Sequence, residues 1–261
     1  MDWLSALAGL LVGTIVGITG VGGGSLMSPV LILLFGIAPT TAVGTDLWFA
    51  AITKTFGSVI HHKQQSADWG IAKWLWIGSI PAAIITVVLM STSGMGPVKG
   101  GVISHVLGIV LIVSAIVTPF RSYISDAMTR VRFDDSAKRF VRLQPILTIL
   151  AGILLGVLVT LTSVGAGAIG ATLLLLLYPL RLTSRKLVGT DILHAVPVAL
   201  VGGIGHLLIG NVNGMLLLSL LVGSIPGIMI GSRLTMWLPN RVIQPALAIV
   251  LLISGIRLLQ S

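Results

Sequence analysis

Long apolar stretches, separated by short polar or glycine-rich breaks, occupy most of the chain. A transmembrane helix needs about 20 mostly apolar residues. The apolar segments are 3–19, 25–36, 41–60, 74–92, 100–118, 144–162, 167–180, 187–209, 214–232 and 242–259. Because 25–36 and 167–180 are short, we expect broken or re-entrant helices there. The pattern predicts an all-α polytopic membrane protein with about 8–10 transmembrane segments.

A glycine run, Thr19-Gly20-Val21-Gly22-Gly23-Gly24-Ser25, interrupts the first apolar stretch. A broken helix survives in a membrane only where it is buried in protein or lines a wet cavity. A helix that restarts near Ser25 would direct free N–H groups into the break, which suits an anion. A weaker copy of this motif follows at Thr162-Ser163-Val164-Gly165-Ala166-Gly167-Ala168. Paired interruptions of this kind indicate a transporter's binding site. The predicted substrate contacts are Thr19, Gly22, Gly23, Gly24, Ser25, Ser163, Gly165 and Gly167.

Other motifs also occur twice, in the same order. Residues 43–46 (Val-Gly-Thr-Asp) recur at 188–191, and residues 78–81 (Gly-Ser-Ile-Pro) recur at 223–226. The chain is therefore expected to contain two structural repeats, residues 1–119 and 144–261, joined by a basic cytoplasmic loop over 120–143.

The distribution of positive charge predicts that the repeats are inverted. Lys and Arg favour cytoplasmic loops. In the first repeat, the turn 36–40 carries no basic residue, whereas the next loop is flanked by Lys63 and Lys73. In the second repeat the order is reversed: residues 181–186 carry three basic residues and 210–214 carry none. This pattern places both termini outside and the central loop inside.

Composition narrows the chemistry further. The chain is 55% hydrophobic and 9% charged, against about 25% charged residues in soluble domains. It has no Cys, which excludes disulfides and thiolate metal sites, and no Glu. Six of the 16 Lys and Arg residues lie at 121–142, where three Asp residues leave a local charge of +3. This is the pattern of a cytoplasmic loop under the positive-inside rule, so the net charge of +9 does not indicate nucleic-acid binding. No metal-ligand spacing or catalytic constellation is present, so we expect no metal, no cofactor and no enzymatic activity.

Two acidic residues, Asp46 and Asp191, fall inside apolar segments at equivalent positions of the repeats. An ionisable side chain inside a membrane indicates function by default. A carboxylate shielded from water can bind and release protons, so both residues are candidates for proton coupling or gating. Alternatively, the Thr-Asp pairs can bind backbone N–H groups at a helix start. Both interpretations stay open, and Thr45 and Thr190 are also candidates for substrate binding.

Lys54 lies in the middle of an apolar segment, and Ala199 occupies its equivalent position. It can contact an anionic substrate, or pair with Asp46, about 12 Å away along a helix. His61 and His206 are repeat partners and candidates for a proton relay, with a packing role as the alternative.

The first glycine motif with Leu26 and Pro29, followed by Val43-Gly44-Thr45-Asp46, resembles the TauE/SafE sulfite exporter family. The resemblance covers nearly the whole chain, while the second motif departs from the first at Ala166 and Ala168. It implies a transporter of sulfur-containing anions in a bacterial or archaeal cytoplasmic membrane, and it implies export driven by the proton-motive force.

Together these features predict a secondary transporter of a small sulfur-containing anion such as sulfite, sulfoacetate or another organosulfonate. It would be proton-coupled, work by alternating access, and have lipids and protons as further partners. The alternatives are a passive anion channel or uniporter, and a membrane assembly protein without transport. The oligomeric state is open, and a homodimer is one option.

Overall fold

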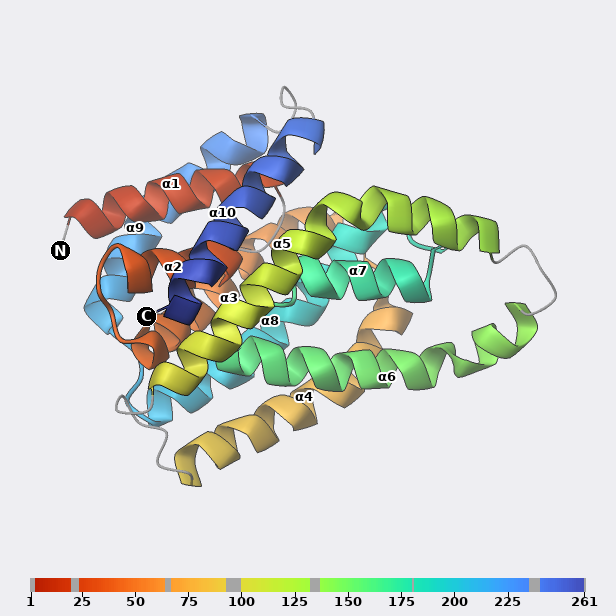
Figure 1. The fold of residues 1–261 in the computed structure, drawn as a ribbon, viewed down its shortest axis with the longest axis horizontal. Coiled ribbons are helices and arrows are strands. Elements are labelled where there is room, and N and C mark those ends of the chain that lie inside the picture. The colour runs from red at the N-terminus through yellow and green to blue at the C-terminus, as the bar shows by residue number, and fades with distance from the viewer. Residues whose placement is uncertain are drawn as a thin grey trace.

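The computed structural model describes residues 3–19, 24–63, 67–92, 100–131, 137–179, 181–234 and 240–260. Within these ranges the protein is all-helical, with no strand (Figure 1). The helices are α1 (Trp3–Thr19), α2 (Gly24–Leu33), α3 (Pro39–Lys63), α4 (Trp69–Thr92), α5 (Gly100–Val131), α6 (Ala137–Thr162), α7 (Ala168–Leu177), α8 (Ser184–Leu208), α9 (Gly214–Leu234) and α10 (Asn240–Gln260).

Helix lengths agree with the hydrophobic pattern. In the described part of the chain, five helices are long and apolar enough to cross a membrane, and α1, α7 and the last part of α10 are shorter apolar helices. Helices α2 and α7 have ten residues each, about 15 Å, which is half of a hydrocarbon core of roughly 30 Å. The prediction of broken helices beside the two glycine motifs therefore agrees with the structure.

The segment 120–143 differs from the predicted loop. Helix α5 continues to Val131 and α6 begins at Ala137, and both extend past the other helices at one end of the molecule (Figure 1). The segment contains no Gly or Pro, and Ala, Met, Lys and Arg favour helices. Charge does not distinguish a loop from a helical extension, and the cytoplasmic location of the segment stays a prediction.

Two pairs of packed helices each combine one helix from the first half of the chain with one from the second half. Helix α1 packs along α9, and α6 packs along α4 (Figure 1). Glycines let the backbones approach closely in both pairs: Gly13 of α1 lies against the Ser224 carbonyl, and Gly156 of α6 lies against the Ser79 carbonyl. Small residues of this kind allow close helix packing in membranes. The predicted repeat makes these two contacts equivalent.

The Thr-Asp motifs make a second equivalent pair of contacts. Thr45 Oγ1 accepts a hydrogen bond from the Asn213 N–H (3.1 Å), and Thr190 Oγ1 accepts one from the Asp68 N–H (2.9 Å). Asn213 and Asp68 cap α9 and α4, respectively, through Leu216 N and Ile71 N. Each half therefore anchors the start of a helix in the other half. A two-fold relation between repeats would produce this exchange, and the inverted orientation itself stays a prediction.

Helices α3 and α8 pack against each other, with the half-length helices α2 and α7 beside them. Phe49 of α3 and Met27 and Leu31 of α2 are completely buried in one core cluster. Leucines and isoleucines on the outer faces of α4, α6 and α9 are exposed, as expected for surfaces that face lipid. The fold thus places α3, α8 and the half-length helices among the remaining helices.

Candidate functional site

The turn between α6 and α7 adopts the most unusual backbone in the described structure. Ser163 has φ 58° and Gly165 has φ 120°. A positive φ is uncommon for a residue with a side chain and is often found at functional sites. Thr162 Oγ1 stabilises the turn by accepting a hydrogen bond from Val164 N (3.1 Å). Helix α7 then begins after Gly167, without a side-chain cap, so its first N–H groups are directed into this turn.

Asp46 of α3 binds the first turns of α2. The Ser28 hydroxyl and backbone N–H both donate to Asp46 Oδ2, at 2.6 and 3.1 Å. The other oxygen, Oδ1, is buried and has no hydrogen-bond partner among the described residues. The Ser163 hydroxyl faces this carboxylate, but within the described structure no hydrogen bond of standard geometry joins them. Ser163 therefore brings the second glycine motif to the acid of the first repeat.

Asp191 of α8 has the equivalent position beside α7. A Cβ atom added to Gly170 would lie 3.0 Å from Asp191 Oδ1, so the carboxylate lies directly against the first turn of this half-length helix. Each half-length helix thus has the acid of its own repeat beside its N-terminal turns. An acid near a helix N-terminus interacts favourably with the helix dipole.

Lys54 belongs to the same cluster. Its ammonium group interacts electrostatically with Asp191 and Asp46 and also with His194. The two hypotheses for Lys54 are therefore compatible: it interacts with both acids, and it supplies a positive charge at the point where the two halves of the chain meet.

His194 and Ser79 complete the polar cluster, although the sequence analysis did not include them in the site. His194 Nε2 is 3.0 Å from Ser79 Oγ. The other ring nitrogen, Nδ1, is buried without a hydrogen-bond partner in the described structure. In the sequence, His194 lies one helical turn after Asp191, so both residues are on one face of α8. Ser28 was likewise missed, although it directly follows the glycine motif.

Other predicted contacts lie elsewhere or cannot be placed. Thr45 and Thr190 use their hydroxyls to anchor Asn213 and Asp68, which favours a structural role over the predicted substrate contact. Gly22 and Gly23 lie outside the described residues. Thr19 ends α1, Gly24 begins α2, and Ser25 follows it as a buried residue.

Of the two predicted relay histidines, His206 is not in the cluster, and the side chain of His61 lies outside the described part of the structure. His206 is completely buried, and its Nε2 lies 3.0 Å from the Thr160 carbonyl oxygen. It is fifteen positions after Asp191 on α8, about 22 Å along the helix axis. This geometry favours the packing alternative for His206. His61 lies in the last turn of α3. In the described part of the chain, no group of three or more His, Asp, Glu or Cys residues could hold a metal ion.

Half-length helices beside buried charged residues, inside a multi-helix membrane fold, are typical of secondary transporters. The chain belongs to the TauE/SafE sulfite exporter family, whose model matches residues 5–258. The expected family membership is thereby confirmed, and the names of the family and its members describe transport, not catalysis.

Similar proteins come from bacteria and archaea. The chain is 38% identical over 254 residues to the probable membrane transporter protein YjnA of Bacillus subtilis (strain 168), covering 97% of this chain and 98% of that protein. It is 30% identical over 256 residues to the probable membrane transporter protein YdhB of the same organism, covering 98% and 99%. It is 27% identical over 220 residues to the probable membrane transporter protein MJ0441 of Methanocaldococcus jannaschii, covering 81% and 74%. No solved structure matches the chain. The protein is a multi-pass protein of a prokaryotic membrane.

Proposed function

We propose that the protein is a proton-coupled secondary transporter that exports a small sulfur-containing anion, such as sulfite, sulfoacetate or another organosulfonate. The observation that carries the proposal is the charged cluster between the repeats, in which Lys54 interacts with both Asp46 and Asp191. The family description supplies the class of anion. Substrate would bind beside Lys54, close to the first turns of α2 and α7.

The chemistry of the cluster suits an oxyanion. Sulfite and sulfonates present three acceptor oxygens and negative charge. The Ser163 hydroxyl and the His194 ring carry buried polar atoms without hydrogen-bond partners in the described structure. The start of α7 adds backbone N–H groups and the positive end of its dipole. Lys54 adds a full positive charge.

Proton coupling follows from competition between carboxylate and substrate. Asp46 accepts two hydrogen bonds from Ser28 near the start of α2, and a substrate anion would seek donors of this same kind. When Lys54, Asp46 and Asp191 are all ionised, the three groups have one excess negative charge, which opposes anion binding at short range. Protonation of one carboxylate removes that excess. Anion and proton would therefore bind together, and a symporter of this kind exports the anion only when the outward gradient of the anion exceeds the inward gradient of the proton.

The test is transport by the purified protein in proteoliposomes. Labelled sulfite, sulfoacetate and taurine are each measured with and without an imposed pH gradient, beside protein-free liposomes. We expect gradient-dependent flux of at least one anion. Flux of the same anion at equal rates with and without the gradient would replace the proposal with a uniporter or channel, and no flux of any probe would reject this substrate class.

A further inference from the structure

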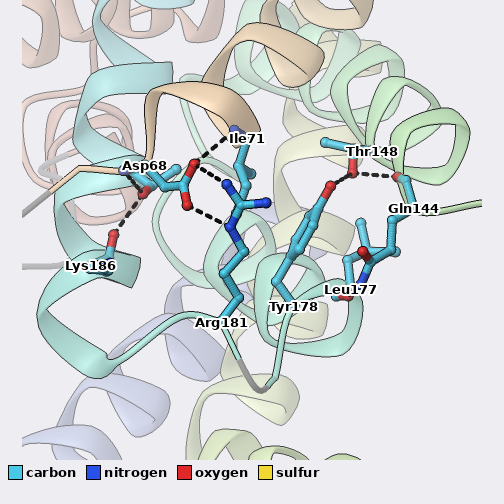
Figure 2. A network of polar contacts seen from close by, with 9 residues as sticks. Asp68, Ile71, Gln144, Thr148, Leu177, Tyr178, Arg181 and Lys186 are labelled. Carbon is cyan, nitrogen blue, oxygen red and sulfur yellow. Dashed lines mark hydrogen bonds and ion pairs between the residues drawn. The ribbon is translucent and has the colours of Figure 1, made fainter. Parts of the chain in front are cut away.

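An ion pair connects two loops at one face of the protein. Arg181, in the turn after α7, donates from Nε to Asp68 Oδ2 (2.7 Å) and from a terminal nitrogen to Asp68 Oδ1 (2.9 Å). Figure 2 shows the Arg181 guanidinium facing the Asp68 carboxylate. Bidentate pairs of this kind fix both distance and orientation. In the described part of the chain it is the only ion pair.

The pair joins the ends of several helices. Asp68 caps α4 through Ile71 N and donates its own N–H to Thr190 of α8. Next to Arg181, Tyr178 ends α7, and its hydroxyl is 2.8 Å from Thr148 Oγ1 of α6 (Figure 2). Four helices of the two repeats, α4, α6, α7 and α8, are therefore tied together at this face. We call it the Asp68 face, defined by Asp68, Arg181 and Thr190.

This face is directly connected to the candidate site. Helix α7 runs from the Asp191 carboxylate at its start to Tyr178 at its end, and Thr190 precedes Asp191 on α8. Movement of α7 or α8 on binding would therefore pull on the ion pair.

The equivalent contact at the other face is uncharged. Asn213 replaces Asp68 in the hydrogen bond to Thr45 and in the cap of α9. The turn that corresponds to Arg181, residues 34–40, has no charged side chain. The repeats therefore share the cap and the hydrogen bond, whereas the ion pair belongs to one face.

The surroundings of the pair suit a contact that opens. The Arg181 side chain is 57% exposed and that of Asp68 is 11% exposed. Water can replace the carboxylate at the half-exposed guanidinium when the loops separate. The Asp68 carboxylate keeps its hydrogen bond from Ile71 N and gains access to water as the face opens.

We propose that the Asp68–Arg181 ion pair is a lock that holds the Asp68 face closed and releases when that face opens during transport. The lock gives the two faces unequal stability in the absence of substrate, so the resting transporter is closed at the Asp68 face. This inference rests on the proposed secondary transporter working by alternating access, but it does not depend on which anion is carried.

The experiment uses the absence of Cys from the natural chain. Ser163→Cys and, separately, His194→Cys introduce one thiol in the candidate site. Right-side-out and inside-out vesicles are treated with a membrane-impermeant, positively charged thiol reagent, and the labelling rate is measured from each face. Asp68→Asn removes the acid but keeps an N-cap, as Asn213 does in the other repeat. Arg181→Gln removes the cation.

We expect Asp68→Asn and Arg181→Gln each to raise labelling from the Asp68 face about fivefold or more, because each shifts the population towards an open Asp68 face. The double variant should add little to either single variant. Arg181→Lys keeps the positive charge but loses the two-pronged geometry of the guanidinium. Its labelling rate should lie between those of the parent and Arg181→Gln. Asn213→Asp is the matched control, since it adds an acid without a basic partner in its turn, and it should leave labelling from the Asp68 face unchanged.

The proposed lock would be overturned if the labelling rates of both cysteine reporters stayed within twofold of the parent. The same conclusion would follow if no variant were labelled. An equal rise from both faces would also overturn the lock, because that result indicates general loosening of the fold. Elution of a variant as aggregates, or as more than one detergent-solubilised species, identifies such loosening. The labelling assay needs no substrate, so its failure is separate from failure of the flux assay.

Discussion

At the scale of single residues, the feature that distinguishes this protein is a positive charge between two carboxylates in a membrane fold. Lys54 has no equivalent in the second repeat, where Ala199 occupies the position. The cluster is therefore asymmetric even though its acids are paired. This asymmetry suits a single substrate anion better than two equivalent sites.

Lys54→Ala should weaken substrate binding, and so raise the anion concentration needed for transport, while the protein still folds. The substitution removes the positive charge that faces Asp46 and Asp191, so anion binding would be opposed by two carboxylates alone. Loss of a charge-assisted contact of about 1.5–3 kcal/mol corresponds to a fall in affinity of roughly 10- to 150-fold. The measurement is flux of the identified anion against its concentration.

Lys73→Ala is the control for this variant, because Lys73 is an exposed lysine on α4. Equal losses in the Lys54 and Lys73 variants would show that overall charge, and not the site, determines flux.

Asp46→Asn should remove the response of transport to pH. The Asn side-chain oxygen can still accept from Ser28 N, so α2 and α3 stay joined, but the side chain no longer takes up a proton. The wild type should transport faster on the side of lower pH, where the protonated carboxyl does not compete with the anion. The check is the initial rate from pH 5.5 to 8.5. Unchanged pH dependence would exclude Asp46 as the coupled group, and Asp191→Asn would be examined next.

The sequence predicted Asp46, Asp191, Lys54 and Ser163 as site residues, and the structure places all four in one cluster, while their roles stay predictions. Hydrophobic context identifies the charged residues, because a charge inside an apolar segment can be recognised from the sequence alone. The partner of a hydroxyl cannot be recognised in this way, so the sequence left both a substrate contact and a structural role open for Thr45 and Thr190.

At the scale of elements, the helices pack through glycines that leave no room for a side chain. In α1, a Cβ atom at Gly13 would lie 2.6 Å from the Ser224 carbonyl oxygen of α9. Backbone atoms of a packed helix cannot move aside as a flexible side chain can. The interface therefore depends on the missing methyl group.

Gly13→Ala should destabilise the protein. Alanine favours a helix by about 1 kcal/mol over glycine, but overpacking costs typically about 1–3 kcal/mol, and a clash with backbone lies at the upper end of that range. The clash should therefore win, and the melting temperature in detergent should fall. Gly101→Ala is the control, because a Cβ atom there meets nothing within 4 Å, and this variant should be neutral or more stable. Equal melting temperatures for the two variants would contradict close packing of α1 on α9.

Element boundaries were predicted well where glycine or proline breaks an apolar run, as at the starts of α2, α7 and α9. They were predicted poorly at the end of α5, where polar helix-forming residues continue the helix beyond the apolar segment. Hydrophobicity reports the environment of a segment, and it does not report backbone conformation outside the membrane.

At the scale of the whole molecule, loops that the charge pattern assigns to the same side of the membrane contact each other in the structure. Asp68 contacts Arg181, and both lie in loops predicted to be cytoplasmic. Thr45, close to the turn 36–40, binds Asn213 of the loop 210–214, and both loops were predicted to be outside. Each predicted side therefore contains loops that are close together in the structure.

Single cysteines should report opposite sides for the turn before α3 and the start of α8. Ala38→Cys and Lys186→Cys are expected to label from opposite faces of the membrane, because the charge pattern of the second repeat is reversed. Gly214→Cys should label from the same face as Ala38→Cys. The assay compares intact cells with inside-out vesicles. Labelling of positions 38 and 186 from one face would reject the inverted topology.

The sequence by itself determined the membrane location, the helices, the paired motifs and the charged residues, because the bilayer makes hydrophobicity, charge and chain breaks directly informative. The tertiary structure decided which of these residues meet. Lys54 interacts with acids from both halves of the chain, the Ser163 hydroxyl faces Asp46, and Arg181 binds Asp68, 113 positions away in the sequence. These contacts depend on how two sets of helices pack across each other, and no one-dimensional pattern records the distance between residues far apart in the chain.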